Sequence, residues 1–360
     1  MSRVARAALV AMALGATPRA HAQLPSPLPE IAANASKSDP YPAHSVTFAN
    51  GVKGIPDVVY DTPDGYRPLT LDLYLPPDSE RRPAAGFPLV IYIHGGGWLA
   101  GNSRHATPFV DFSGVLASLA ARGYVVASIN YRLSGAARFP AQIQDTKSAI
   151  RWLGTNASKW GIDPKRSLAW GVSAGGHLAA LAAVSCGQNT LEPQRFRKSV
   201  VPDANNNVGT ASDVSDCVQG AVAWYGVFDM STITAQAKLD GAMSRADRTG
   251  PEWELLGCFG DQECTPAQLA AASPVTYVNR TSPPMLLIVG SADKVVPREQ
   301  TLEMSRRLDS AGVKHELIEI PEANHSLIGT TPQLTRDANL KALSATFSFI
   351  DKTIGKPDHH

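Results

Sequence analysis

The chain has 360 residues, a formal net charge of +1 and a composition that is 44% hydrophobic and 18% charged. A chain of this length holds one large domain or two ordinary ones, and this composition excludes a disordered chain or a bundle of membrane helices. The near-neutral charge gives no basis for binding nucleic acid, and we expect neither a nucleic acid nor a membrane as partner.

The first residues have the pattern of an export signal. Arg3 and Arg6 precede a short apolar segment at 7–16, and Ala-His-Ala at 20–22 supplies the small residues of a cleavage site. The apolar segment is too short to span a bilayer, and an ordinary N-terminal helix is the alternative. We expect residues 1–22 to be a cleaved signal peptide and the mature protein to be secreted or periplasmic in a bacterium.

Residues 23–55 are rich in Pro, Ala, Ser and Asn and are expected to form an extended leader. After it, over 56–355, short apolar runs alternate with helical patterns. The runs expected to be strands are 58–62, 69–76, 88–95, 124–132, 167–173, 221–229, 285–293 and 315–323. The first two alternate apolar and polar residues around a turn sequence, which is typical of an antiparallel hairpin at a sheet edge. The later runs are more continuously apolar, as in strands covered on both faces.

Helical patterns occupy 140–161, 297–312 and 332–353. The alternation predicts a single α/β domain with a mostly parallel eight-stranded sheet, helices on both faces and right-handed crossovers. Two long segments, 187–215 and 230–256, interrupt it. Segments of this kind are either lids and binding loops or surface insertions, and the sequence favours neither.

A G-x-S-x-G motif at 171–175 lies between an apolar run and an alanine-rich helical pattern. A serine on such a strained strand-to-helix corner crowds its neighbours, which glycine relieves, and its hydroxyl is exposed. The helix N-terminus behind it favours developing negative charge. Ser173 is therefore the predicted nucleophile.

A serine hydroxyl needs a general base to take its proton. His325 follows the last predicted strand, and we expect it to be this base. Asp293 follows the preceding strand and is the predicted orienting acid, with Glu322 as a rival. The chain order of serine, acid and base is that of α/β-hydrolases. His177 lies within the helix after Ser173 and is expected to point into the fold.

Three consecutive glycines follow His94 and precede Trp98. Bare backbone suits an oxyanion hole, because glycines let amide groups turn inward and approach closely. We expect the amides of Gly96, Gly97 and Ala174 to form this hole and His94 to anchor the loop. Trp98 either lines the substrate pocket or packs beneath the loop. The spacing is not that of a phosphate-binding loop, and we expect no cofactor.

Four cysteines remain after the expected cleavage: Cys186, Cys217, Cys258 and Cys264. In an oxidising compartment an even count favours disulfides. Cys258 and Cys264 share a short polar loop and are expected to pair, which leaves Cys186 for Cys217; four reduced thiols are the alternative. The spacing is not that of a zinc site, so we expect no metal.

The motifs HGGGW, NYRL (130–133), FPAQIQD (139–145), GVSAGGHLA, GSADKVVP and ANHS together resemble the hormone-sensitive-lipase-like esterases. They resemble more closely the bacterial feruloyl- and acetyl-xylan-type (BD-FAE-like) esterases of the α/β-hydrolase superfamily. The resemblance covers about 55–350 and implies a metal-free serine hydrolase of carboxylic esters, often aryl or carbohydrate-linked. It also implies that Arg132 pairs with Asp145 to hold loops. The cysteine loop around 258–264 and the 187–215 insertion depart from the group, and the insertion is expected to lie where the substrate would be selected.

Three functions remain open at this point. The first is an exported serine esterase that acts on a small-molecule or polysaccharide-linked ester through an acyl-enzyme on Ser173. The second is a serine peptidase of the prolyl-oligopeptidase type, which shares the triad order but usually carries a large propeller that this length does not accommodate. The third is a non-catalytic binding protein on a hydrolase fold. Acyl length, alcohol and oligomeric state do not follow from the sequence.

Overall fold

The computed structural model of the chain describes residues 44–193, 214–239, 241, 250–258 and 262–355. The chain divides into two units, 1–42 and 43–360, of which the first lies outside the described residues, as does the expected signal peptide. No helix among the described residues is long and apolar enough to cross a membrane.

The second unit is built on one nine-stranded sheet in the order β1-β2-β3-β5-β4-β6-β7-β8-β9. The strands are β1 (Val46–Thr47), β2 (Lys53–Asp61), β3 (Leu69–Leu75), β4 (Phe87–Ile93), β5 (Val125–Ile129), β6 (Ile162–Val172), β7 (Ala221–Trp224), β8 (Met285–Gly290) and β9 (His315–Ile320). Strands β4 to β9 pair in parallel, whereas β1, β2 and β3 are antiparallel. This arrangement confirms the predicted mixed, mostly parallel sheet.

The expected count of eight strands is wrong by one. All eight predicted strands form, but Val46 and Thr47 add a ninth by pairing with Gly54 and Lys53 of β2. Two residues are too few to show a strand pattern, so only the pairing with β2 defines this strand. The sheet therefore begins inside the segment expected to be a leader, and β1 rather than β2 is its edge.

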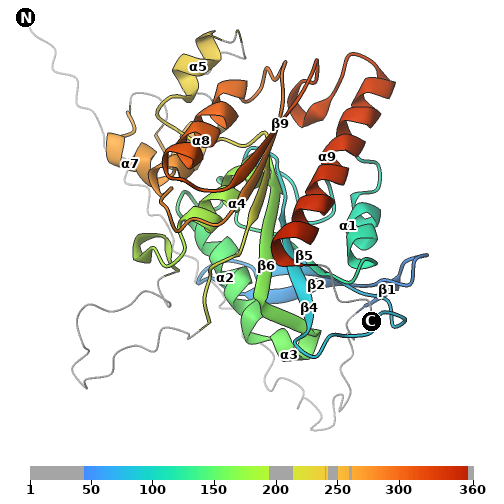
Figure 1. Cartoon of the computed structure of the whole chain (residues 1–360). Helices are drawn as coiled ribbons and strands as arrows, with labels where there is room; N and C mark the ends of the chain where they lie inside the picture. The colour runs from blue at the N-terminus through green and yellow to red at the C-terminus, as the bar shows by residue number, and fades with distance from the viewer. Residues whose placement is uncertain (1–43, 194–213, 240, 242–249, 259–261, 356–360) are drawn as a thin grey trace, which may run out of the picture. The chain divides into compact units, whose positions relative to one another are not determined.

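Helices cover both faces of the sheet (Figure 1). They are α1 (Phe112–Ala120), α2 (Ala141–Thr155), α3 (Ala157–Trp160), α4 (Ala174–Val184), α5 (Ile233–Leu239), α6 (Pro251–Leu256), α7 (Pro266–Ala271), α8 (Arg298–Ser310) and α9 (Pro332–Ile354). One apolar core lies between the sheet and α2, α4 and α8, and a second lies between the opposite face and α1 and α9. Because β4 and β8 are buried along their whole length, their sequences are apolar without alternation.

The predicted helix at 140–161 is interrupted at Asn156, which corrects the sequence expectation. The Asn156 side chain donates to the carbonyl of Trp152 at 2.9 Å where α2 ends. The next helix, α3, ends at Trp160 and is capped by Gly161, whose backbone is in the left-handed region. Of the two predicted insertions, 187–215 lies mostly outside the described residues. The segment 230–256 contributes α5 and α6, with 240 and 242–249 outside the described residues.

The register of the parallel strands brings their carboxyl ends to one edge. Ile93 of β4 lies opposite Gly171 of β6, and Gly171 lies opposite Ala223 of β7. The residues that follow these strands therefore emerge side by side. Loops after the carboxyl ends of parallel strands are where α/β proteins bind ligands.

Candidate active site

Ser173 occupies a strained corner between β6 and α4, with φ 54° and ψ −121°. A Cβ atom on Gly171 would lie 2.1 Å from the carbonyl oxygen of Gly175, and one on Gly175 would lie 2.0 Å from that of Ile93. Both glycines of the motif are thus needed for the chain to make this turn. The Ser173 amide donates to the carbonyl of Trp224 at 2.8 Å, which ties the corner to β7.

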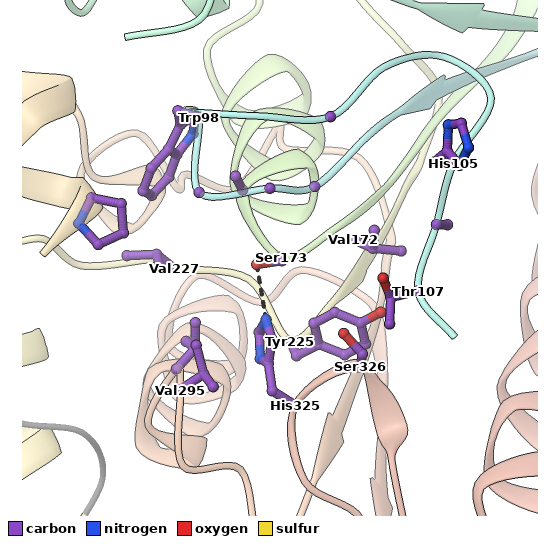
Figure 2. Close-up of a pocket in the computed structure, with 18 of the residues that line it drawn as sticks. Trp98, His105, Thr107, Val172, Ser173, Tyr225, Val227, Val295, His325 and Ser326 are labelled. Atoms are coloured by element: carbon purple, nitrogen blue, oxygen red, sulfur yellow. Dashed lines mark hydrogen bonds between the residues drawn. The ribbon is translucent and has the colours of Figure 1, made fainter. Parts of the chain in front are cut away.

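His325 reaches this serine from the loop after β9. Its Nε2 lies 3.0 Å from Ser173 Oγ (Figure 2). The imidazole packs edge-on against Tyr225, with ring centroids 4.7 Å apart. Tyr225 is a site residue that sequence reasoning missed. It directly follows β7, which ends at Trp224 rather than at 229 as expected, so the sequence pattern placed Tyr225 inside the strand and not at its end.

Asp293 holds the other side of the imidazole ring. Its Oδ2 lies 2.8 Å from His325 Nδ1, and its Oδ1 accepts from the amides of Val295 and Val296 at 2.8 and 2.9 Å. Only 2% of Asp293 is exposed, so the backbone contacts fix this carboxylate inside the protein. The rival acid Glu322 is solvent-exposed, and Asp293 is the carboxylate that the structure places on the ring.

Asn324, also missed from the sequence, joins the two loops that carry acid and base. Its Oδ1 accepts from the amides of Lys294 and His325, at 2.8 and 2.7 Å. An amide oxygen shared in this way fixes the spacing of the Asp293 and His325 loops. Its position immediately before the histidine was the only sequence signal.

The glycine loop lies over Ser173, as Figure 2 shows. Gly96 and Gly97 have φ of +108° and +61°, and a Cβ on Gly96 would lie 2.2 Å from the carbonyl oxygen of Ala100. Among the described residues, the amides of Gly96, Gly97 and Ala174 donate no hydrogen bond to another backbone or side-chain group. All three residues line the pocket around Ser173, so these donors are available to a ligand.

His94 anchors the start of the glycine loop. Its ring stacks on Tyr131 at 4.3 Å and its Nδ1 contacts the carbonyl of Gly95 at 2.7 Å, while the Tyr131 hydroxyl donates to the His94 carbonyl. Burial lowers the pKa of His94 to about 4, so the ring is neutral at pH 7. His177 also points into the fold: its Nε2 donates to the carbonyl of Ala272 at 2.8 Å.

Trp98 both packs inside the protein and lines the pocket, which are the two alternatives that the sequence left open. Only 1% of the residue is exposed, and the indole packs perpendicular to His177 with centroids 5.1 Å apart. The indole therefore packs into the protein against a residue of α4. The same residue also borders the pocket (Figure 2), so it forms a rigid part of the wall.

The pocket around Ser173 has a volume of about 360 Å³ and two chemically different sides. Trp98, Val227 and Val295 lie on one side of the serine, and Val172, His105, Thr107, Tyr225 and Ser326 lie on the other (Figure 2). The three residues named on the first side are apolar, whereas the second side combines Val172 with an imidazole and hydroxyl groups; Glu252 also lines the pocket.

Arg132 and Asp145 form a two-pronged ion pair. The guanidinium Nη2 and Nε lie 2.7 and 2.9 Å from the two carboxylate oxygens, and the Arg132 amide donates to the same carboxylate at 2.9 Å. This pair ties the loop after β5 to the first turns of α2, and neither residue lines the pocket around Ser173. Its geometry agrees with the structural role that the resemblance implied.

Two disulfides join the four cysteines in the expected pairs, Cys186 to Cys217 and Cys258 to Cys264. Asp216 lies close to the first of these, but the two sulfur atoms are bonded to each other and are not available as metal ligands. A buried group of charges adjoins this disulfide.

In this group Lys147 and Arg151 of α2 each contact both Glu192 and Asp216. Two cations and two anions balance there, with all four side chains at most 11% exposed. Glu192 precedes and Asp216 follows the segment 194–213. The ion pairs thus tie Glu192 and Asp216 to α2, and the disulfide ties Cys217 to the residues that follow α4.

The fold and the hydrogen-bonded serine, histidine and aspartate define the chain as an α/β-hydrolase. It belongs to the BD-FAE family, whose model matches residues 71–308.

Curated relatives carry names of ester hydrolases. The esterase LipQ of Mycobacterium tuberculosis is 31% identical over 73% of this chain and 55% of LipQ. An ethyl acetate hydrolase of Pseudomonas putida is 30% identical over 76% of each chain. The chain thus spans about half the length of the mycobacterial relative.

Solved structures of esterases are also similar to this chain. A truncated carbohydrate esterase from gut microbiota is 29% identical, with a TM-score of 0.62, over 83% of this chain and 96% of that chain. An esterase of Thermogutta terrifontis is 25% identical, with a TM-score of 0.59, over 88% of this chain and 95% of that chain.

Proposed function

We propose that this chain is an exported serine esterase that hydrolyses carboxylic esters through an acyl-enzyme on Ser173. The observation that carries the proposal is the continuous hydrogen-bonded line from Asp293 through His325 to Ser173, beside three unengaged amides. Family membership and the names of the relatives support it.

In the proposed first step, His325 Nε2 takes the proton of Ser173 Oγ as the oxygen attacks the ester carbonyl carbon. The carbonyl oxygen becomes an oxyanion, which accepts hydrogen bonds from the amides of Gly96, Gly97 and Ala174. The intermediate collapses when the carbon–oxygen bond to the alcohol breaks and His325 gives its proton to the departing oxygen. Asp293 holds the imidazole in the orientation and tautomer that this transfer needs.

In the second step, water replaces the alcohol. His325 takes a proton from the water as its oxygen attacks the acyl carbon, and the same amides stabilise the second oxyanion. Collapse breaks the bond to Ser173 Oγ, which regains its proton from His325, and the acid leaves. Each proton that the imidazole takes is returned within the same step.

The proposed substrates are short-acyl or aryl esters, including carbohydrate-linked acetyl and feruloyl esters. The carbohydrate esterase among the structural neighbours supports a carbohydrate alcohol, and the apolar wall of Trp98, Val227 and Val295 supports a small apolar acyl group. Export rests on the basic and apolar start of the sequence. The two disulfides support it, because disulfides persist in oxidising compartments.

The test is hydrolysis of an ester panel with acetyl, butyryl, octanoyl and feruloyl donors by the wild type and by Ser173→Ala. We expect hydrolysis of at least one short or aryl ester, and a kcat for the variant lower by about four to six orders of magnitude. A decrease below tenfold would place the nucleophile elsewhere. Cleavage of dipeptidyl anilides without ester hydrolysis would favour a peptidase, and inactivity on all substrates a binding protein.

A further inference from the structure

We propose that the loop 102–107 is the alcohol side of the pocket and that His105 recognises a hydroxyl group of a polyhydroxy alcohol such as a sugar. This assignment rests on the proposed esterase function and adds the residue that selects the leaving group. It is carried by the polarity of the pocket, the anchoring of the loop and the tautomer of one imidazole that lines the pocket.

The two sides of the pocket suit the two parts of a carbohydrate ester. An acyl chain offers carbon to Trp98, Val227 and Val295, whereas a sugar carries hydroxyl groups that lose water on binding and need new partners. His105 and Thr107 are exposed and line the opposite side of Ser173 (Figure 2). The polar side therefore fits the alcohol.

A buried carboxylate fixes the loop. Asp72, on β3 and only 4% exposed, accepts from Ser103 Oγ at 2.7 Å and from Arg104 Nε and Nη2 at 2.8 and 2.9 Å. Ser103 also receives a hydrogen bond from Ser128 Oγ on its carbonyl, at 2.6 Å. Burial alone would raise the pKa of Asp72, but its hydrogen bonds, those from Arg104 foremost, hold it below the usual value. The carboxylate is thus charged and the loop is held at neutral pH.

The tautomer of His105 follows from its neighbour. Asn102 Oδ1 accepts from the backbone amide of Arg104 at 2.9 Å, which identifies that atom as the oxygen, because an amide nitrogen would not accept. The same oxygen lies 2.9 Å from His105 Nδ1, so Nδ1 must carry the hydrogen. In the neutral ring Nε2 is then a hydrogen-bond acceptor. A sugar hydroxyl is a matching donor.

The test compares two esters with the same acyl group: an acetylated methyl xyloside and ethyl acetate. The ratio of their kcat/KM values isolates the alcohol side. We expect His105→Phe, which keeps an aromatic ring without the nitrogen acceptor, to lower this ratio about three- to tenfold. His105→Gln, which retains an acceptor, should restore part of it. His44→Phe is the matched control, because His44 is exposed and does not line the pocket.

An unchanged ratio in His105→Phe would overturn the assignment, as would a wild type that hydrolyses ethyl acetate but not the xyloside ester. A change confined to the preference between acetyl and butyryl donors would make this loop the acyl side and would also overturn it. Failure of the esterase proposal is distinct: the wild type would then hydrolyse neither ester, and the assignment would fall with it.

Discussion

Ser173 Oγ and His325 Nε2 lie 3.0 Å apart although 152 residues separate them in the chain. The parallel sheet produces this proximity, since the residues after β6, β8 and β9 emerge at the same edge. Asp293 completes the line from the middle strand of the three.

Asp293→Asn should lower kcat about 10⁴-fold while leaving the fold intact, because an amide no longer holds the imidazole in the required tautomer. Glu322→Gln is the matched control, as it makes the same chemical change at an exposed carboxylate nearby. Steady-state kinetics on a short-acyl ester measures both. A larger loss in the Glu322 variant would reassign the acid.

Gly96→Ala should lower kcat about 10²- to 10³-fold, because the added Cβ would lie 2.2 Å from the Ala100 carbonyl oxygen and displace the loop amides. Gly135→Ala is the control, since a Cβ there meets no atom within 4 Å. Kinetics of both variants, with circular dichroism to confirm folding, gives the comparison. Equal activity of the two variants would argue against an oxyanion hole in this loop.

Stability should increase with pH between about pH 4 and 6.5 partly because of His177. Burial lowers its folded pKa to about 4, whereas an unfolded histidine titrates near 6.5. Within that window the unfolded state binds the extra proton, so each pH unit adds about 1.4 kcal/mol to the free energy of unfolding. Urea unfolding across this range should show a slope smaller by about that amount in His177→Gln. An identical slope would mean that the histidine is already protonated in the fold.

Removing the Cys186–Cys217 disulfide, by serine at both positions, should lower the free energy of unfolding by about 3 to 4 kcal/mol. Removing Cys258–Cys264 should lower it by only about 2 kcal/mol, because a sequence separation of 6 rather than 31 closes a smaller loop. Denaturant unfolding of both double variants checks the order. Melting curves of the wild type that are the same with and without reductant would instead indicate free thiols.

Most residues of the site could be predicted from the sequence because local constraints fix their identity. The corner at Ser173 accepts only glycine at positions 171 and 175. The loops that carry Asp293 and His325 each follow an apolar strand. Other features depend on distant partners. Val46 and Thr47 form a strand only against β2. Asp72 lies in a run that reads as an ordinary alternating strand, and it has its role only because the loop 102–107 folds onto it. The side on which Trp98 packs likewise depends on His177.

The most direct test of the account is covalent labelling with a fluorophosphonate, followed by peptide mapping. The hydrogen-bonded line to Asp293 should make one hydroxyl reactive, so we expect a single adduct on the peptide that contains Ser173, which Ser173→Ala abolishes. An unlabelled wild-type protein, or an adduct on a different serine, would contradict the assignment of this residue as the nucleophile.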